Sequence, residues 1–168
     1  IYMGILSDTP AKLGYVSDSL RRKDDIDNDN NGVTGRVFDM SACDFETISM
    51  LDSVDIILLD NYDTGKFSRN NIRVLKRWIA TGGTLVVGTG SNYQKEFEKL
   101  HSTLIRGYIG KTERISTSFG WNEKEETDTE STNETDSMEI DIVNLRLNED
   151  SVLIDDGRKL MISKELGN

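Results

Sequence analysis

Hydroxyl, carboxylate and amide side chains follow three short apolar runs in this chain, together with glycines. These residues are Ser7, Asp8, Asp60, Asn61, Tyr62, Thr89, Gly90 and Ser91. In open parallel α/β sheets a ligand binds outside the carboxyl ends of the strands, where such residues would meet. The pattern therefore predicts a ligand-binding site made of these eight residues.

Gly88–Ser91 stands between a predicted strand and a predicted helix start. Backbone N–H groups at such a junction can hold an anion. The alternative is that the glycines only permit a tight turn.

A second group of oxygen-bearing residues resembles the opening of a calcium loop. Asp27, Asp29, Asn31 and the glycine that follows fit the pattern D-x-D-x-N-G, in which alternate side-chain oxygens converge on the ion. The acid expected at the twelfth position is missing, because Phe38 stands there. The alternative is a polar turn, since Asn and Asp tolerate left-handed backbone.

No residue is predicted to be catalytic. A thiol nucleophile needs an adjacent base, whereas Cys43 is followed by an acid that disfavours the thiolate. His101, the one histidine, is expected to be a surface side chain, and Thr89 has no base nearby in sequence. Asp8 and Asp60 could form a carboxylate pair, although acids at strand ends commonly cap helices.

The stretch from Val54 to Gly90 predicts the elements that position the first group. Asp55–Asp60 is an apolar run bounded by acids, typical of a strand buried on both faces. Ser68 is a predicted N-cap for a helix with one apolar face, which Gly82 and Gly83 end. A second apolar run, 84–87, follows, and a parallel strand pair joined through a helix is almost always right-handed.

Other segments complete an alternating pattern that becomes mostly β. The predicted strands are 2–6, 36–40 and 140–143, with extended structure at 103–119 and a hairpin at 152–162; the predicted helices are 9–20, 45–51 and 93–100. We expect a single α/β domain over 1–168, with a three-layer parallel-sheet core at 1–101. Residues 102–168 are expected to form a mostly β extension that contains a mobile acidic loop at 122–137.

The charge of the chain is concentrated in one segment. The net charge is −10, and 123–141 contributes −8 through nine acids and one lysine. The remainder is near neutral, which argues against nucleic-acid binding. No apolar run is long enough to span a bilayer, so we expect membrane attachment only through segments outside this chain. Because it opens on Ile1 without a signal peptide, the chain is expected to be a fragment or a processed form.

Residues 1–101 resemble the class I glutamine amidotransferase-like fold, which is flavodoxin-like. The resemblance lies in Asp55–Asp60, Leu75–Ile79, Gly82-Gly83 and Gly88–Gly90, and is nearest to degenerate domains in extracytoplasmic parts of bacterial membrane-anchored proteins. It implies a nucleophilic cysteine at the turn after the strand that follows Gly82-Gly83, and a histidine later in the chain. Glycine and threonine occupy that turn, and His101 follows too soon.

These observations predict a non-catalytic module that binds an unidentified ligand or protein, within a larger bacterial surface or membrane-anchored protein. The resemblance implies an extracytoplasmic location, and no cofactor is predicted. Two alternatives stay open. One is a hydrolase or carbohydrate-acting enzyme that uses strand-end carboxylates, and the other is a calcium-stabilised adhesion module.

Overall fold

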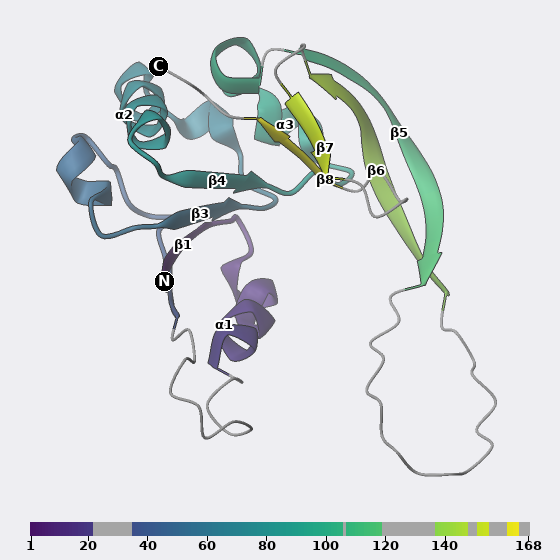
Figure 1. The fold of residues 1–168 in the computed structure, drawn as a ribbon, viewed down its shortest axis with the longest axis horizontal. Coiled ribbons are helices and arrows are strands. Elements are labelled where there is room, and N and C mark those ends of the chain that lie inside the picture. Colours follow the sequence, from purple (N-terminus) through teal and green to yellow (C-terminus); the bar gives the residue numbers. More distant parts are fainter. Residues whose placement is uncertain (22–34, 106, 119–136, 148–150, 155–160, 165–168) are drawn as a thin grey trace.

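A parallel four-stranded sheet forms the centre of the molecule (Figure 1). The computed structural model describes residues 1–21, 35–105, 107–118, 137–147, 151–154 and 161–164. The strands β1 (Tyr2–Leu6), β2 (Arg36–Asp39), β3 (Ile56–Leu59) and β4 (Thr84–Val87) lie in the order β2-β1-β3-β4. All three pairings are parallel, and helices connect the strands, so the predicted α/β class is confirmed.

Helix α2 (Arg69–Ala80) connects β3 to β4 and begins as the sequence predicts. The Ser68 hydroxyl accepts a hydrogen bond from the Asn71 amide at 3.0 Å, and the Asn71 side chain accepts one from the Ser68 amide at 2.8 Å. This reciprocal capping box satisfies two backbone donors that a helix start otherwise leaves unpaired.

Helix α2 ends in a turn that fixes its large aromatic side chain. Gly82 has a φ of +109°, a left-handed conformation that glycine adopts at little cost. Gly83 leaves room for the Trp78 ring, because a Cβ there would lie 2.2 Å from it. The indole N–H donates to the Val54 carbonyl at 3.1 Å, which joins the helix end to the start of β3.

The main core lies between the sheet and α2. Ile57 and Leu59 of β3 have no exposed surface and pack with Leu6 of β1 and with Leu75 and Trp78 of α2. Full burial of one such aliphatic side chain stabilises a fold by about 2 kcal/mol. Strand side chains alternate between faces, so the intervening β3 residues point to the other side of the sheet.

Three predicted helices differ from those observed. The predicted helix 9–20 opens as a 3-10 turn, Pro10–Leu13, before α1 (Gly14–Arg21), and 45–51 contributes only a 3-10 turn at Ile48–Leu51. The predicted helix 93–100 is a short helix, α3 (Tyr93–Phe97).

Residues 103–105 are helical rather than extended, because a π-helical turn spans His101–Ile105. That turn places Leu104 in the core beside Leu100, and such burial outweighs the local sequence pattern. A further 3-10 turn, Thr64–Lys66, follows β3.

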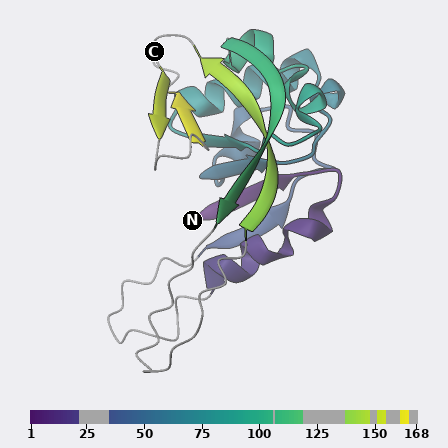
Figure 2. The ribbon, with the colours of Figure 1, turned by 90° about the vertical axis from the view of Figure 1, so that its right-hand side faces the viewer.

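The second half of the chain contains two antiparallel pairs. Strands β5 (Gly107–Ser118) and β6 (Ser137–Leu147) form a long curved ribbon beside the α/β part (Figures 1 and 2). Strand β7 (Ser151–Ile154) pairs with β8 (Met161–Lys164), so the second strand of the predicted hairpin lies slightly later than expected. The predicted acidic loop overlaps β6 at Ser137, and its other residues lie outside the described part.

Substitution of Gly83 by alanine tests the packing at the end of α2. The new Cβ would overlap the Trp78 ring, so we expect Gly83→Ala to lower the free energy of unfolding by about 3 kcal/mol. Urea unfolding followed by circular dichroism measures the change. The matched control is Gly14→Ala, because a Cβ at Gly14 meets nothing within 4 Å; equal destabilisation by both changes would contradict this packing.

Candidate functional site

The carboxyl ends of β1, β3 and β4 meet at one edge of the sheet, as the sequence predicts. The Asp60 amide donates to the Leu6 carbonyl at 3.1 Å, and the Asp8 amide donates to the Asn61 carbonyl at 3.2 Å. The Gly88 amide donates to the Leu59 carbonyl at 2.8 Å. These bonds bring the predicted site residues of the three strands together at this edge, which we call the carboxyl edge.

Ser7 is engaged in holding the turn after β1. It is 1% exposed, and its amide donates to the Ser41 hydroxyl at 2.9 Å. Its own hydroxyl accepts a hydrogen bond from the Thr9 amide at 3.0 Å. A side chain that is buried and bonded in this way shapes the loop and is not presented to a ligand.

Asp8 and Tyr62 meet around one lysine. The Lys66 ammonium forms an ion pair with Asp8 and lies 5.1 Å from the centre of the Tyr62 ring. The hydrogen bond to Asp8 raises the pKa of Lys66. Tyr62 packs against Phe67 with ring centroids 5.4 Å apart, and burial raises the pKa of its phenol. The ion pair is solvent-exposed, so water and salt screen it and it contributes little to stability.

Asn61 connects the end of β3 to two other loops. Its φ of +48° is in the left-handed region, which Asn tolerates better than most side chains. Its side-chain oxygen accepts from the Asn92 amide group at 2.7 Å, and its own amide group donates to the Thr9 hydroxyl at 3.4 Å. The backbone N–H donates to Glu96 Oε1 at 2.5 Å.

Glu96 belongs to this edge although the sequence prediction omitted it. It lies on α3, is 2% exposed, and its Oε2 is buried without a hydrogen-bond partner. Burial raises the pKa of Glu96 to about 7; the Asn61 N–H opposes that rise, and the nearby Asp60 adds to it. The available signal was spacing, because Glu96 stands at helical intervals from Tyr93 and Leu100.

At the glycine turn after β4, the Asp60 carboxylate lies close to the backbone of Gly88. A Cβ at Gly88 would lie 2.7 Å from Asp60 Oδ1, so the Asp60 carboxylate would have to move if Gly88 carried a side chain. Among the described glycines, only Gly82 has a positive φ, so the turn at 88–90 does not require left-handed backbone.

The surroundings disfavour the anion considered for Gly88–Ser91. Thr89 is half-buried, Gly90 and Ser91 are exposed, and the Gly90 carbonyl accepts from the Tyr93 amide at 3.1 Å. The carboxyl groups of Asp60 and Glu96 lie at the same edge, and α3 is only five residues long. A negative ligand would be repelled by the Asp60 carboxylate.

Cys43 and His101 do not form a catalytic pair. Both are exposed, and no hydrogen bond joins them. The His101 Nε2 bonds instead to the Gly107 carbonyl at 2.8 Å. The calcium candidates Asp27, Asp29 and Asn31 lie outside the described residues. Within the described part, no three His, Cys, Asp or Glu side chains are grouped to hold a metal ion.

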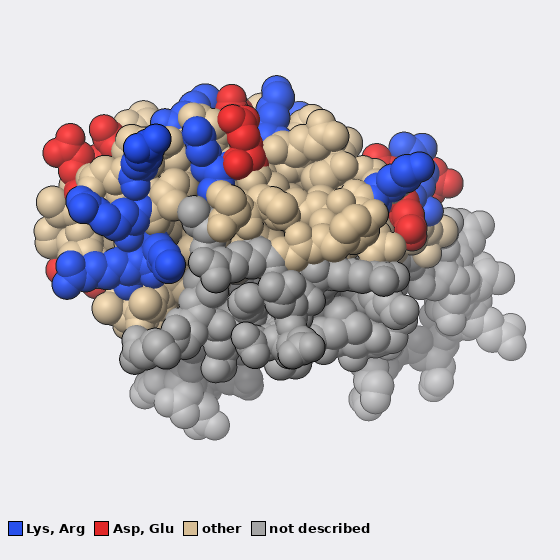
Figure 3. All heavy atoms as spheres, turned by 90° about the horizontal axis from the view of Figure 1, so that it is seen from above, with Lys and Arg blue, Asp and Glu red and all other residues tan. Residues whose placement is uncertain are grey.

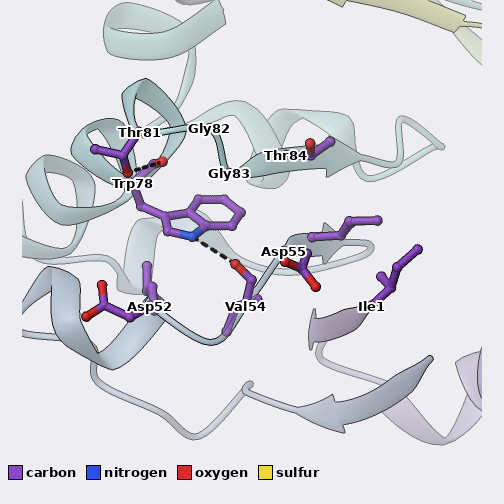
Figure 4. A pocket seen from close by; sticks show the side chains of 11 residues that line it. Ile1, Asp52, Val54, Asp55, Trp78, Thr81, Gly82, Gly83 and Thr84 are labelled. Atoms are coloured by element: carbon purple, nitrogen blue, oxygen red, sulfur yellow. Dashed lines mark hydrogen bonds between the residues drawn. The ribbon is translucent and has the colours of Figure 1, made fainter. Parts of the chain in front are cut away.

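A hollow of about 510 Å³ lies at the opposite, amino edge of the sheet (Figure 4). Its lining includes Asp52, Asp55, Trp78 and Thr84. The Trp78 ring is 4% exposed and its N–H is bonded to Val54, while an Asp55 oxygen accepts from the Tyr2 amide at 2.7 Å. Trp78 and Asp55 therefore already have structural roles at this hollow.

Basic side chains cover the outer face of α2. The four bases Arg69, Arg73, Lys76 and Arg77 are all exposed, and none forms an ion pair with a described residue. In Figure 3, Lys and Arg side chains gather mainly over the left part of the surface, and a smaller group lies towards the right-hand end. We call this group the basic face of α2; it contrasts with the acidic carboxyl edge.

No family model, curated protein or solved structure matches this chain. Among the described residues, no helix is both long enough and apolar enough to cross a membrane.

Two substitutions of Asn61 separate backbone strain from side-chain bonding. Alanine removes the side-chain bonds and retains a strained φ, whereas glycine removes the same bonds without that strain. We expect Asn61→Ala to be less stable than Asn61→Gly by about 1 kcal/mol in urea unfolding. An alanine variant as stable as the glycine variant would refute a strained Asn61.

Proposed function

We propose that this chain is a non-catalytic α/β binding module, a degenerate relative of class I glutamine amidotransferase-like domains. It would act within a larger bacterial surface or membrane-anchored protein, outside the cytoplasm. The strand order β2-β1-β3-β4 supports this proposal, because flavodoxin-like sheets have the order 2-1-3-4-5. We also propose that helices cover both faces of this sheet in the three-layer, flavodoxin-like arrangement.

The main support is the way in which the polar groups of the carboxyl edge are engaged. The Ser7 hydroxyl accepts the Thr9 amide within its own turn, while the Asn61 side chain and the Asp8 carboxylate bond to neighbouring loops. The turn that would hold a thiol in an amidotransferase contains Gly88 and Thr89, while Cys43 lies after β2. An edge bonded in this way forms a preorganised rim that can bind a ligand without catalysing a reaction.

The charge of the rim favours a neutral or cationic polar ligand. Asp60 is half-buried near Glu96, and Asp63 is half-buried in the turn after β3. Lys66 does not neutralise them, because it is paired with Asp8. Hydroxyl, amide or ammonium groups can donate to such carboxylates, whereas an anion would be repelled. For a protein partner, the basic face of α2 supports an acidic docking surface.

One observation favours the alternative, a carboxylate hydrolase. Asp60 lies near Glu96, whose pKa burial raises to about 7, and a carboxyl group with a raised pKa beside a second carboxyl group is typical of acid–base catalysis. The burial of Glu96 argues against this function, since a catalytic acid must reach its substrate. Binding therefore stays the preferred proposal.

A glutaminase assay tests the non-catalytic part of the proposal. We expect the chain to release no ammonia from L-glutamine above the level of a heat-denatured sample. Asp60→Asn is the control for carboxylate chemistry with a panel of aryl glycosides and esters. Turnover by the wild type that this variant loses without loss of folding would support the hydrolase instead.

Amide chemical shifts test the location of binding. Monosaccharides, amino-acid amides and polyamines are added separately as probes. We expect at least one of them to shift the amide resonances of Asp8, Asn61 and Thr89. Asp60→Asn should weaken the binding of polyamines about tenfold, since a hydrogen bond to a charged group contributes about 1.5 kcal/mol or more. Shifts confined to Gly82–Thr84, at the amino edge, would contradict the proposed site.

A further inference from the structure

Helix α3 is attached to the loop after β3 by bonds that converge on one short segment. Thr64, which has no exposed surface, donates from its hydroxyl to the Lys95 carbonyl at 2.9 Å and accepts from the Lys99 amide at 3.1 Å. Glu96 accepts the Asn61 N–H at 2.5 Å. A five-residue helix has little stability of its own, so these contacts hold it in place.

Glu96 differs from the other members of this set because its bonding is incomplete. Oε1 has a partner, whereas Oε2 is buried without one. A buried carboxylate with an unpaired oxygen is costly, and the protonated form avoids most of that cost. The side chain is nine-tenths buried or more, so solvent cannot screen its charge.

The charges around Glu96 do not supply a cationic partner. Asp60, at the end of β3, is negative and opposes ionisation of Glu96. In the turn after β3, Asp63 accepts the Gly65 amide and Lys66 pairs with Asp8. Lys95, Glu98 and Lys99 are exposed on or beside α3. Among the described residues, no ion pair to Glu96 is formed.

We propose that Glu96 is a proton-operated latch: its neutral carboxyl group holds α3 against the loop after β3, and its ionisation releases the helix. Release separates the Glu96 carboxyl group from Asn61 and exposes it to water, where the charged form is solvated. The latch involves loss or gain of one proton from solvent and needs no other reactant.

The direction of the pH effect follows from the two states of Glu96. Burial raises its pKa from an ordinary 4.5 to about 7 in the closed state, whereas in the open state the group is solvated. The proton therefore favours closure most strongly below pH 4.5, and this contribution is lost as the pH rises to about 7. Above that range both states are ionised, and opening changes no further.

Hydrogen exchange of single amides tests the latch. The probes are the Asn61 and Lys99 amides, which bond to Glu96 and Thr64. Protection factors, corrected for intrinsic exchange and divided by those of β3 amides, are followed from pH 4.5 to 8. For wild type we expect a fall of about two orders of magnitude that levels off near pH 7.

Glu96→Gln, Glu98→Gln and Asp60→Asn complete the test. Glutamine at 96 has the same shape without a titrating proton, so its normalised protection should not change with pH. Glu98→Gln, the matched control on an exposed neighbour, should behave as wild type, and Asp60→Asn should level off at a lower pH. Constant normalised protection in wild type would overturn the latch, as would recovery of protection on adding calcium chloride at pH 8, which would indicate a metal ion as the occupant.

Discussion

The hydrogen bond between the Asn61 amide and the buried Glu96 carboxyl group determines how the carboxyl edge is built. Asn61 reverses the chain in a left-handed conformation directly after β3, and Glu96 accepts the N–H that this reversal turns inward. The same contact fixes α3 beside the turn after β3. Ser7, Asp8 and Asn92 form further bonds at the same edge.

An edge that carries the residue types used in catalysis need not be an active site when those side chains are already bonded to other parts of the protein. The residue types at the three strand ends are those that catalysis also uses. Here the Ser7 hydroxyl supports a turn, Asp8 pairs with Lys66, and Asp60 lies against Gly88. While α3 is held in place, the bonds of Ser7, Asp8 and Asn61 preorganise the rim, and preorganisation favours binding through a lower entropic cost.

Sequence reasoning found the elements whose local and tertiary signals agree. Ser68 caps α2, Gly82 ends it in left-handed backbone, and the apolar runs of β3 and β4 pair as expected. The strand-end residues were predicted because parallel strands place their carboxyl ends together. The short 3-10 and π-helical turns were not predicted, because they depend on burial of residues such as Leu104.

Helical spacing places Glu96 on the same face as Tyr93 and Leu100, but the sequence does not show its bonding, because its partner lies thirty-five residues earlier in the chain. The sequence shows a glutamate in a polar helical segment, and only the folded chain places it beneath a loop with one oxygen unpaired. The most direct test of this account is a carbon-13 NMR titration of the Glu96 carboxyl carbon. The account predicts a midpoint near pH 7, and a midpoint near 4.5 would contradict it.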